Sequence, residues 1–227
     1  MNSALTASRW DDEYRNRRYV DEPPLPFVDT IIAALEADRA AWDGTGLYVG
    51  CGNGRNYLPL VDAGLNLSGL DMSPQAITGL TERRPALRQR LVCGDFRAFP
   101  IADRHLDYVI AIQVFQHGDA ADVATYFGRV AALLRPGGLF FLRVNSAATD
   151  VYYGHSVVER NGFGGFTIRY EEGPKHGLLV HFYSGQELLE RMKRDFRLLT
   201  EPREDVTRRS APKIGCWVQW EGVWQRR

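Results

Sequence analysis

The chain contains 227 residues, 44% of them hydrophobic, and its 28 basic and 28 acidic side chains leave no net charge. Such a balance creates no overall field that draws a protein to nucleic acid or a membrane surface, and no apolar run approaches the roughly eighteen residues of a membrane span. Residues 1–12 lack the apolar core of a signal peptide, and Cys51, Cys93 and Cys216 show no metal-ligand spacing. We therefore expect a cytoplasmic protein with reduced thiols, no metal site, no membrane partner and no nucleic-acid partner.

The N-terminal segment, residues 1–26, is polar and ends in a Pro-Pro-Leu-Pro sequence. Trp10, Tyr14 and Tyr19 are spaced among arginines there, which predicts a short helix or ordered arm followed by an extended break. Two interpretations stay open: a lid folded over a concave site, or an ordinary amphipathic helix. Residues 27–41 then carry a helical stripe of apolar side chains.

A glycine-rich loop follows the first predicted strand. Residues 47–54 read Leu-Tyr-Val-Gly-Cys-Gly-Asn-Gly, an apolar stub that turns sharply into a helix. Glycines let the backbone approach a ligand closely, and the following helix N-terminus offers unpaired N–H groups. Asp71 closes the next apolar stub, where a carboxylate is placed to accept hydrogen bonds from a ribose diol. These features predict a nucleotide-type ligand across the ends of two neighbouring parallel strands.

The elements that follow alternate between helix and strand, the pattern of a parallel sheet covered on both faces. Ser73 is expected to cap a helix over residues 74–83, with proline at its first position. Further strands are expected at 91–96 and 106–112, and a helix at 119–134 leads through a turn into a fifth strand that ends at residue 142.

After residue 144 the alternation stops. Residues 166–170 and 178–183 alternate like two strands around a turn-rich stretch, which predicts an inserted hairpin. Ser184 is expected to cap a helix that runs to Arg194, with Glu187 as its capping-box partner. Residues 196–201 and 214–220 are expected to form the last two strands.

Several of these features together resemble the class I S-adenosylmethionine-dependent methyltransferases. The matching residues are Gly50-Cys51-Gly52-Asn53-Gly54, Asp71, Gly94-Asp95, Asp107 and Arg135-Pro136-Gly137-Gly138. The resemblance implies a Rossmann-like, doubly wound, mostly parallel seven-stranded sheet with an antiparallel last strand, plus the β-hairpin insertion. One methyltransferase domain would then span residues 1–227, comprising an arm or lid (1–26), a cofactor-binding core (46–145), a substrate-side insertion (146–183) and a closing helix with two strands (184–227).

The resemblance also implies the cofactor, S-adenosyl-L-methionine, and its contacts. Asp71 would bind the ribose, Asp95 the exocyclic amine of the adenine, and Gln113 would face the sulfonium. Tyr48 departs from the family, which usually has an acidic residue there to help bind the cofactor ammonium. The expected cofactor-binding residues are Tyr14, Arg18, Gly50, Cys51, Gly52, Asn53, Gly54, Asn56, Asp71, Met72, Asp95, Phe96 and Gln113.

For the methyl acceptor, His117 and His181 are the candidate catalytic residues, since a near-neutral pKa suits a proton acceptor. A histidine that only hydrogen-bonds a helix start is the alternative for His117, and core packing is the alternative for the aromatic residues of the insertion. The expected substrate-binding residues are Tyr19, His117, Tyr152, Tyr153, His155, His181 and Tyr183.

The resemblance implies methyl transfer to a small-molecule acceptor by in-line displacement. Two alternatives remain: an RNA or protein methyltransferase, and a non-catalytic protein that binds S-adenosylmethionine. A basic strip could serve a macromolecular acceptor, yet neighbouring acids favour a solvated surface. The protein is expected to be a monomer or a homodimer, and the acceptor atom is left open. The strip consists of Arg194, Arg197, Arg203, Arg208 and Arg209.

Overall fold

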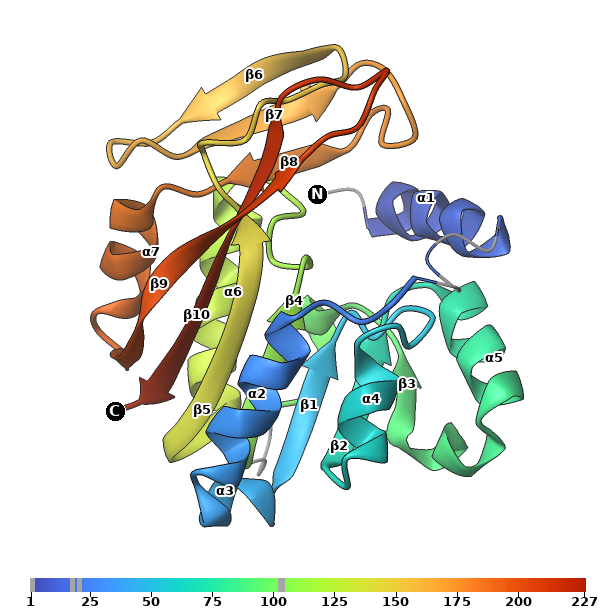
Figure 1. Ribbon diagram of the computed structural model, residues 1–227, viewed down its shortest axis with the longest axis vertical. Coiled ribbons are helices and arrows are strands. Elements are labelled where there is room, and N and C mark those ends of the chain that lie inside the picture. The colour runs from blue at the N-terminus through green and yellow to red at the C-terminus, as the bar shows by residue number, and fades with distance from the viewer. Residues whose placement is uncertain (1–2, 17–18, 20–21, 102–104) are drawn as a thin grey trace.

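The computed structural model describes residues 3–16, 19, 22–101 and 105–227. Its main sheet has seven strands in the order β3-β2-β1-β4-β5-β10-β9 (Figure 1). Strand β10 runs antiparallel to both of its neighbours, and the other pairs are parallel. This confirms the predicted fold class. The strands are Thr45–Val49 (β1), Asn66–Asp71 (β2), Leu91–Cys93 (β3), Leu106–Ile112 (β4), Leu134–Asn145 (β5), Phe196–Arg208 (β9) and Cys216–Arg226 (β10).

Helices cover both faces of this sheet, and alternate residues of each strand serve the two faces. On β1, Tyr48 packs into a cluster with the first four core helices, whereas Leu47 and Val49 pack into a second cluster with the last two. The first set is Phe27–Glu36 (α2), Arg39–Trp42 (α3), Tyr57–Asp62 (α4) and Pro74–Arg83 (α5); the second is Ala120–Leu133 (α6) and Gly185–Met192 (α7).

Local signals account for several of the helix boundaries. Ser73 accepts a hydrogen bond from the Ala76 amide and Pro74 occupies the first turn, so α5 begins and ends as predicted. The single helix predicted over residues 27–41 is instead divided, because Asp38 adopts an extended conformation and caps α3 by accepting from the Ala41 amide at 3.2 Å.

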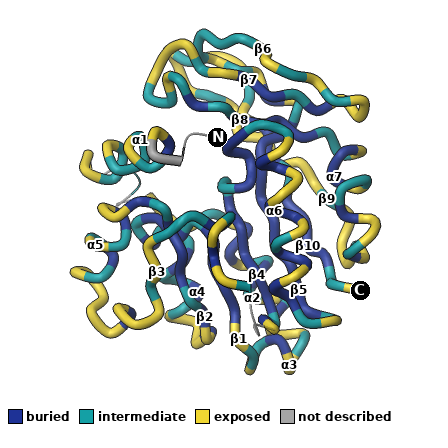
Figure 2. Tube along the Cα trace, turned by 180° about the vertical axis from the view of Figure 1, so that it is seen from behind, coloured by how far each residue is buried: buried dark blue, intermediate teal, exposed yellow. Residues whose placement is uncertain are grey.

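The insertion is larger than the expected hairpin. The two predicted strands are Phe166–Tyr170 (β7) and Leu179–Phe182 (β8), and a third, His155–Arg160 (β6), pairs with β7 to make a separate antiparallel sheet. Figure 2 shows buried positions concentrated in the central strands of the main sheet and exposed ones along β6. Three parts of the chain lie beyond the carboxyl ends of the parallel strands (Figure 1). They are this small sheet, helix Ser3–Arg15 (α1), and the connected ends of β9 and β10, which are the C-terminal end of β9 and the N-terminal end of β10. Among the described residues, no helix combines the length and apolar character that crossing a membrane requires.

Candidate functional site

A cavity of about 560 Å³ lies at the carboxyl ends of β1, β2 and β4. The loops after these strands line one end of it, and α1 contributes Trp10 and Tyr14 from the side. The insertion and the β9–β10 connection line the other end, with Tyr153 and Lys213 among their residues. In an open α/β sheet this edge, where the strand order reverses between β1 and β4, is where ligands bind.

The glycine loop after β1 is shaped for close approach. Gly50 and Gly52 have positive φ values of 72° and 51°, a region that side chains rarely adopt. A Cβ on Gly52 would lie 2.5 Å from the Tyr14 hydroxyl of α1. The loop is tied to β2, because the Gly50 and Cys51 amides both donate to the Leu70 carbonyl, at 2.7 and 3.0 Å. A fixed backbone surface therefore faces the cavity here.

Asp71, at the end of β2, is buried and lines the cavity. One of its oxygens accepts from the Gly52 amide at 2.8 Å and the other from the Ser73 amide at 2.9 Å. Burial outweighs these hydrogen bonds and raises the pKa of Asp71 to about 6. Each carboxylate oxygen can accept a second hydrogen bond, so Asp71 can still bind a diol from the cavity.

Gln113 follows β4 with a φ of 61°, which is uncommon for a residue other than glycine. Its amide N–H donates to the Arg143 carbonyl of β5 at 2.7 Å and its side-chain N–H donates to Gln219 of β10 at 2.8 Å, so these two strands hold it in place. Residues held in sparsely populated backbone regions cluster at functional sites, and Gln113 lines the cavity.

Helix α1 docks on the site through specific contacts. Asp11 accepts hydrogen bonds from the Ser73 hydroxyl and from the Gln75 amide, at the N-terminus of α5. Trp10 stacks on Tyr14 with ring centroids 6.0 Å apart and meets the His117 ring edge-on at 5.4 Å. These contacts hold α1 against the N-terminus of α5 and against His117.

His117 is 5% exposed and lines the cavity. Neither ring nitrogen has a hydrogen-bond partner in the described part of the chain, so the side chain is not spent on a helix start. Burial, reinforced by the Lys175 charge, lowers the pKa of His117 to about 3. The imidazole is therefore neutral near pH 7. A neutral imidazole with so low a pKa is better suited to hydrogen-bond a substrate than to remove a proton from it.

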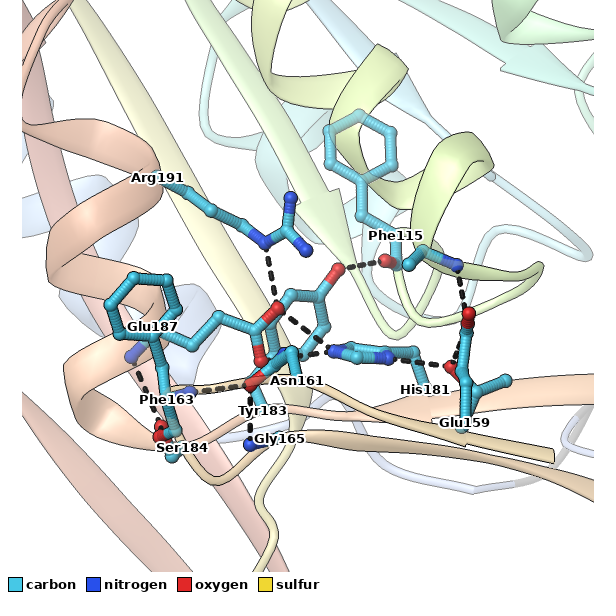
Figure 3. Close-up of polar contacts among 12 residues, drawn as sticks. Phe115, Glu159, Asn161, Phe163, Gly165, His181, Tyr183, Ser184, Glu187 and Arg191 are labelled. Carbon is cyan, nitrogen blue, oxygen red and sulfur yellow. Dashed lines mark hydrogen bonds and ion pairs between the residues drawn. The ribbon is translucent and has the colours of Figure 1, made fainter. Parts of the chain in front are cut away.

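The structure contradicts the catalytic and substrate-binding roles expected for His181. Its side chain is 1% exposed and lies outside the cavity lining. Nδ1 lies 2.8 Å from the Thr167 hydroxyl, and Nε2 lies 3.0 Å from each oxygen of Glu187 (Figure 3). Arg191 donates to the same carboxylate at 2.7 Å, so Glu187 serves this cluster in place of the expected capping box. His181 joins the insertion to α7.

Three further expectations are also corrected, because the residues do not line the cavity. Tyr183 is fully buried and its hydroxyl donates to the Phe115 carbonyl (Figure 3). His155 places Nδ1 2.8 Å from the Tyr153 carbonyl. Gly54 lies where a Cβ would meet Leu58 of α4 and Leu80 of α5.

The remaining expected residues converge on the cavity, except Arg18, which lies outside the described residues. Asp95 lines the cavity while it pairs with Arg97 at 2.5 Å. The expected residues that line the cavity are Tyr14, Tyr19, Gly50, Cys51, Gly52, Asn53, Asn56, Asp71, Met72, Asp95, Phe96, Gln113, His117, Tyr152 and Tyr153.

Tyr48, where the related enzymes usually have an acid, is buried and lines the cavity. Burial raises its pKa, while a hydrogen bond to Asn56 acts in the opposite direction. Two acids absent from the expected site, Glu13 and Glu22, also line the cavity. Glu22 pairs with Arg55 at 2.7 Å. Besides Asp71 and Asp95, the acids that line the cavity thus come from the N-terminal segment.

Sequence reasoning missed most of the far end of the cavity. Arg143 and Asn145 come from the end of β5, Arg209 and Lys213 from the β9–β10 connection, and Trp217 from the start of β10. Of these, only Arg209 had a sequence signal, as part of the basic strip.

Comparison with known proteins identifies the central region. Residues 47–142 match the family model described as a methyltransferase domain. A ubiquinone biosynthesis O-methyltransferase of Methylobacterium sp. strain 4-46 is 34% identical over 98 residues, which is 41% of this chain and 37% of that protein. A 2-methyl-6-phytyl-1,4-hydroquinone methyltransferase of Synechocystis is 28% identical over 57% of this chain and 43% of that protein. The alignments therefore span less than half of these relatives.

Similarity to solved structures extends further along the chain. The crystal structure of the Burkholderia thailandensis 1,6-didemethyltoxoflavin-N1-methyltransferase, with 1,6-didemethyltoxoflavin and S-adenosylhomocysteine bound, has a TM-score of 0.67 to this protein. The similarity covers 98% of this chain and 88% of that one at 21% sequence identity. The two proteins thus share their fold beyond residues 47–142.

Proposed function

We propose that the chain is a class I S-adenosylmethionine-dependent methyltransferase and transfers the methyl group of this cofactor to a small-molecule acceptor. The match of residues 47–142 to the methyltransferase-domain model supports this proposal. One observation carries the proposal: the loops of the nucleotide-type site line one end of a single cavity, and the insertion and the β9–β10 connection line the other end. We call this other end, with Tyr152, Tyr153 and Lys213 in its lining, the chamber under the insertion. A methyl donor and an acceptor can therefore meet inside the cavity.

The residues at the first end fit the cofactor. Asp71 retains acceptor capacity for the ribose hydroxyls. Met72 and Phe96 offer apolar surface for an adenine, with Asp95 beside them as an acceptor for its amine. The positive-φ loop at Gly50 and Gly52 leaves room for the methionine portion. These assignments follow the family resemblance and stay within one cavity.

The bound cofactor would supply an electrophilic methyl group, and the protein supplies alignment. In-line displacement needs little acid–base help when the acceptor is already nucleophilic, so positioning and exclusion of water account for most of the rate. Helix α1 closes the side of the cavity through Trp10 and Tyr14. His117, neutral and with both ring nitrogens unpaired among the described residues, can orient the acceptor by a hydrogen bond.

The basic strip gives little support to a macromolecular acceptor. Arg203 pairs with Glu221 at 2.9 Å, and Arg194 pairs with Asp195 at 3.0 Å. Arg197 donates to Gln225. Two of the five charges in the strip are thus paired with carboxylates, which weakens the field that a polyanion would meet there.

The test is transfer of isotope-labelled methyl groups from S-adenosylmethionine into a cell extract, which is then separated into a small-molecule fraction and a fraction of RNA and protein. We expect label in the small-molecule fraction, and none with the Asp71→Ala variant under limiting cofactor. Label in RNA or protein instead would support the macromolecular alternative. Cofactor binding without labelling of either fraction would support a non-catalytic protein.

A further inference from the structure

The chamber under the insertion contains two cations whose charge is not cancelled. Lys213 and Arg209, both half-buried, line it from the β9–β10 connection. Lys213 Nζ lies 5.3 Å from the ring centre of Tyr153 and 5.9 Å from that of Tyr152. Arg209 donates one hydrogen bond, to the Ile214 carbonyl at 3.1 Å. Within the described residues, neither cation forms an ion pair.

A third cation in the chamber shows the contrast. Arg143 is 3% exposed, and its two terminal nitrogens bind Glu221 and Asp205. Its charge is therefore neutralised inside the protein. Asp150 accepts a hydrogen bond from the Cys216 amide, at the start of β10, at 2.7 Å. Among the described residues it forms no ion pair with Lys213 or Arg209. Lys213 and Arg209 are thus left to meet a charge from the cavity.

The walls beside these cations are aromatic. Tyr152 and Tyr153 pack edge to face with ring centres 5.2 Å apart, and both line the chamber. Trp217 lines it from β10, with its indole N–H fixed on Asn145 at 3.0 Å. Aromatic side chains bury flat apolar surface at low cost in side-chain entropy. A planar apolar ring packs against such side chains better than a flexible polar molecule does.

We propose that the methyl acceptor is a planar, aromatic or conjugated molecule that carries an anionic group, a carboxylate or a phosphate. The anion binds Lys213 and Arg209, and the ring lies against Tyr152, Tyr153 and Trp217. This inference rests on the proposed function, because it places the acceptor in the same cavity. It explains why two cations without an ion pair among the described residues lie beside aromatic side chains in this chamber, since burying unpaired charge is costly unless a ligand compensates it.

The test uses three probes of one shape: benzoate, phenyl phosphate and the neutral benzamide. Each is titrated into protein saturated with S-adenosylhomocysteine, and binding is followed by calorimetry and saturation-transfer NMR. We expect at least one anionic probe to bind more tightly than benzamide, and the stronger of the two identifies the anion. Lys213→Ala and Arg209→Ala should each weaken it about tenfold or more, as the loss of a charge-assisted hydrogen bond does. Lys213→Arg should retain most of the affinity.

Lys193→Ala is the matched control, because Lys193 pairs with Glu190 on the exposed side of α7. Equal binding of benzamide and both anions, or unchanged anion affinity in Lys213→Ala and Arg209→Ala, overturns the inference. Titration of S-adenosylhomocysteine into the same variants separates this failure from that of the proposed function. If the cofactor product binds normally while anion selectivity is absent, only the acceptor class is refuted; if it does not bind the wild-type protein, both fall.

Discussion

Asp71 is the residue on which cofactor affinity should depend most, because its oxygens hold the glycine loop and face the cavity together. Replacing Asp71 with alanine should weaken S-adenosylhomocysteine binding by about 1–3 kcal/mol, the range for loss of charge-assisted hydrogen bonds. Calorimetry measures the effect. Asp62→Ala is the control, since Asp62 pairs with Arg84 in an exposed ion pair at the end of α4. Equal affinities in the two variants would refute the ribose role.

The raised pKa of Asp71, about 6, also predicts a pH dependence. A carboxyl group whose folded pKa lies above its unfolded value contributes stability at low pH, and that contribution is lost as the pH rises from about 4 through 6. Cofactor affinity should move the opposite way, since the ionised form is the better acceptor for a diol. We expect S-adenosylhomocysteine to bind more weakly below pH 6 in the wild type, with a flatter profile in Asp71→Asn. Parallel profiles for the two proteins would count against ionised Asp71 as the acceptor.

His117 differs from a conventional base because its pKa is lowered to about 3. Its protonation should therefore produce no inflection in the rate of methyl transfer between pH 5 and 8. His117→Ala should reduce the rate by less than the roughly 10²–10⁴-fold expected for loss of a general base, and the shape of the pH profile should stay the same. An inflection near pH 6.5 that disappears in His117→Ala would instead show that His117 acts as a general base.

The site residues that sequence reasoning identified come mostly from loops in which the signal is local. The glycine loop and Asp71 directly follow predicted strands, so their meeting at one sheet edge can be deduced. His181 could not be assigned in this way. Its partners Thr167 and Glu187 come from β7 and α7, and only the folded chain brings them together.

At the scale of elements, α1 is the segment whose function is most directly testable. Neither of the two large core clusters contains a residue of α1, so removal of residues 1–15 should leave the domain folded. Turnover should fall, because water enters the cavity and the acceptor is less well aligned. Hydrogen exchange should show added protection of α1 on binding S-adenosylhomocysteine.

A point variant separates closure from mere bulk. Trp10→Ala removes the contact with His117 and should lower turnover, whereas Asp12→Ala, which breaks an exposed pair with Arg15, should not. Unchanged exchange of α1 on cofactor binding, together with normal turnover of the truncated protein, would mean that the helix only packs on the surface.

Element boundaries were predictable where caps or alternation mark them, as at Ser73 for α5. The third strand of the insertion, β6, was not, because Val157 and Val158 are adjacent and both exposed, which breaks the alternation. The sequence also failed to predict the length of β9, which was expected to end at residue 201 and extends to Arg208. Its charged second half is held as strand by pairing with β10, including Asp205 opposite Gln219, and tertiary pairing of this kind overrides local preference.

For the whole molecule, the cavity exists only because distant segments meet over one edge of the main sheet (Figure 1). The parallel core supplies the nucleotide-type end through loops that a sequence pattern reveals. The other end needs β10 to return beside β5, which brings Lys213 and Trp217 to the same cavity as Arg143. The fold class and the cofactor end could therefore be predicted from the sequence, whereas the other end of the cavity could not, apart from Tyr152 and Tyr153.

The most direct test of the central claim is a pair of calorimetric titrations of the purified full chain, one with S-adenosylhomocysteine and one with NAD. A ligand held by the native state also raises the melting temperature by mass action, so a thermal-shift measurement accompanies each titration. We predict saturable binding of one S-adenosylhomocysteine per chain with a raised melting temperature, and no effect of NAD. Binding of NAD without binding of S-adenosylhomocysteine would contradict the assignment.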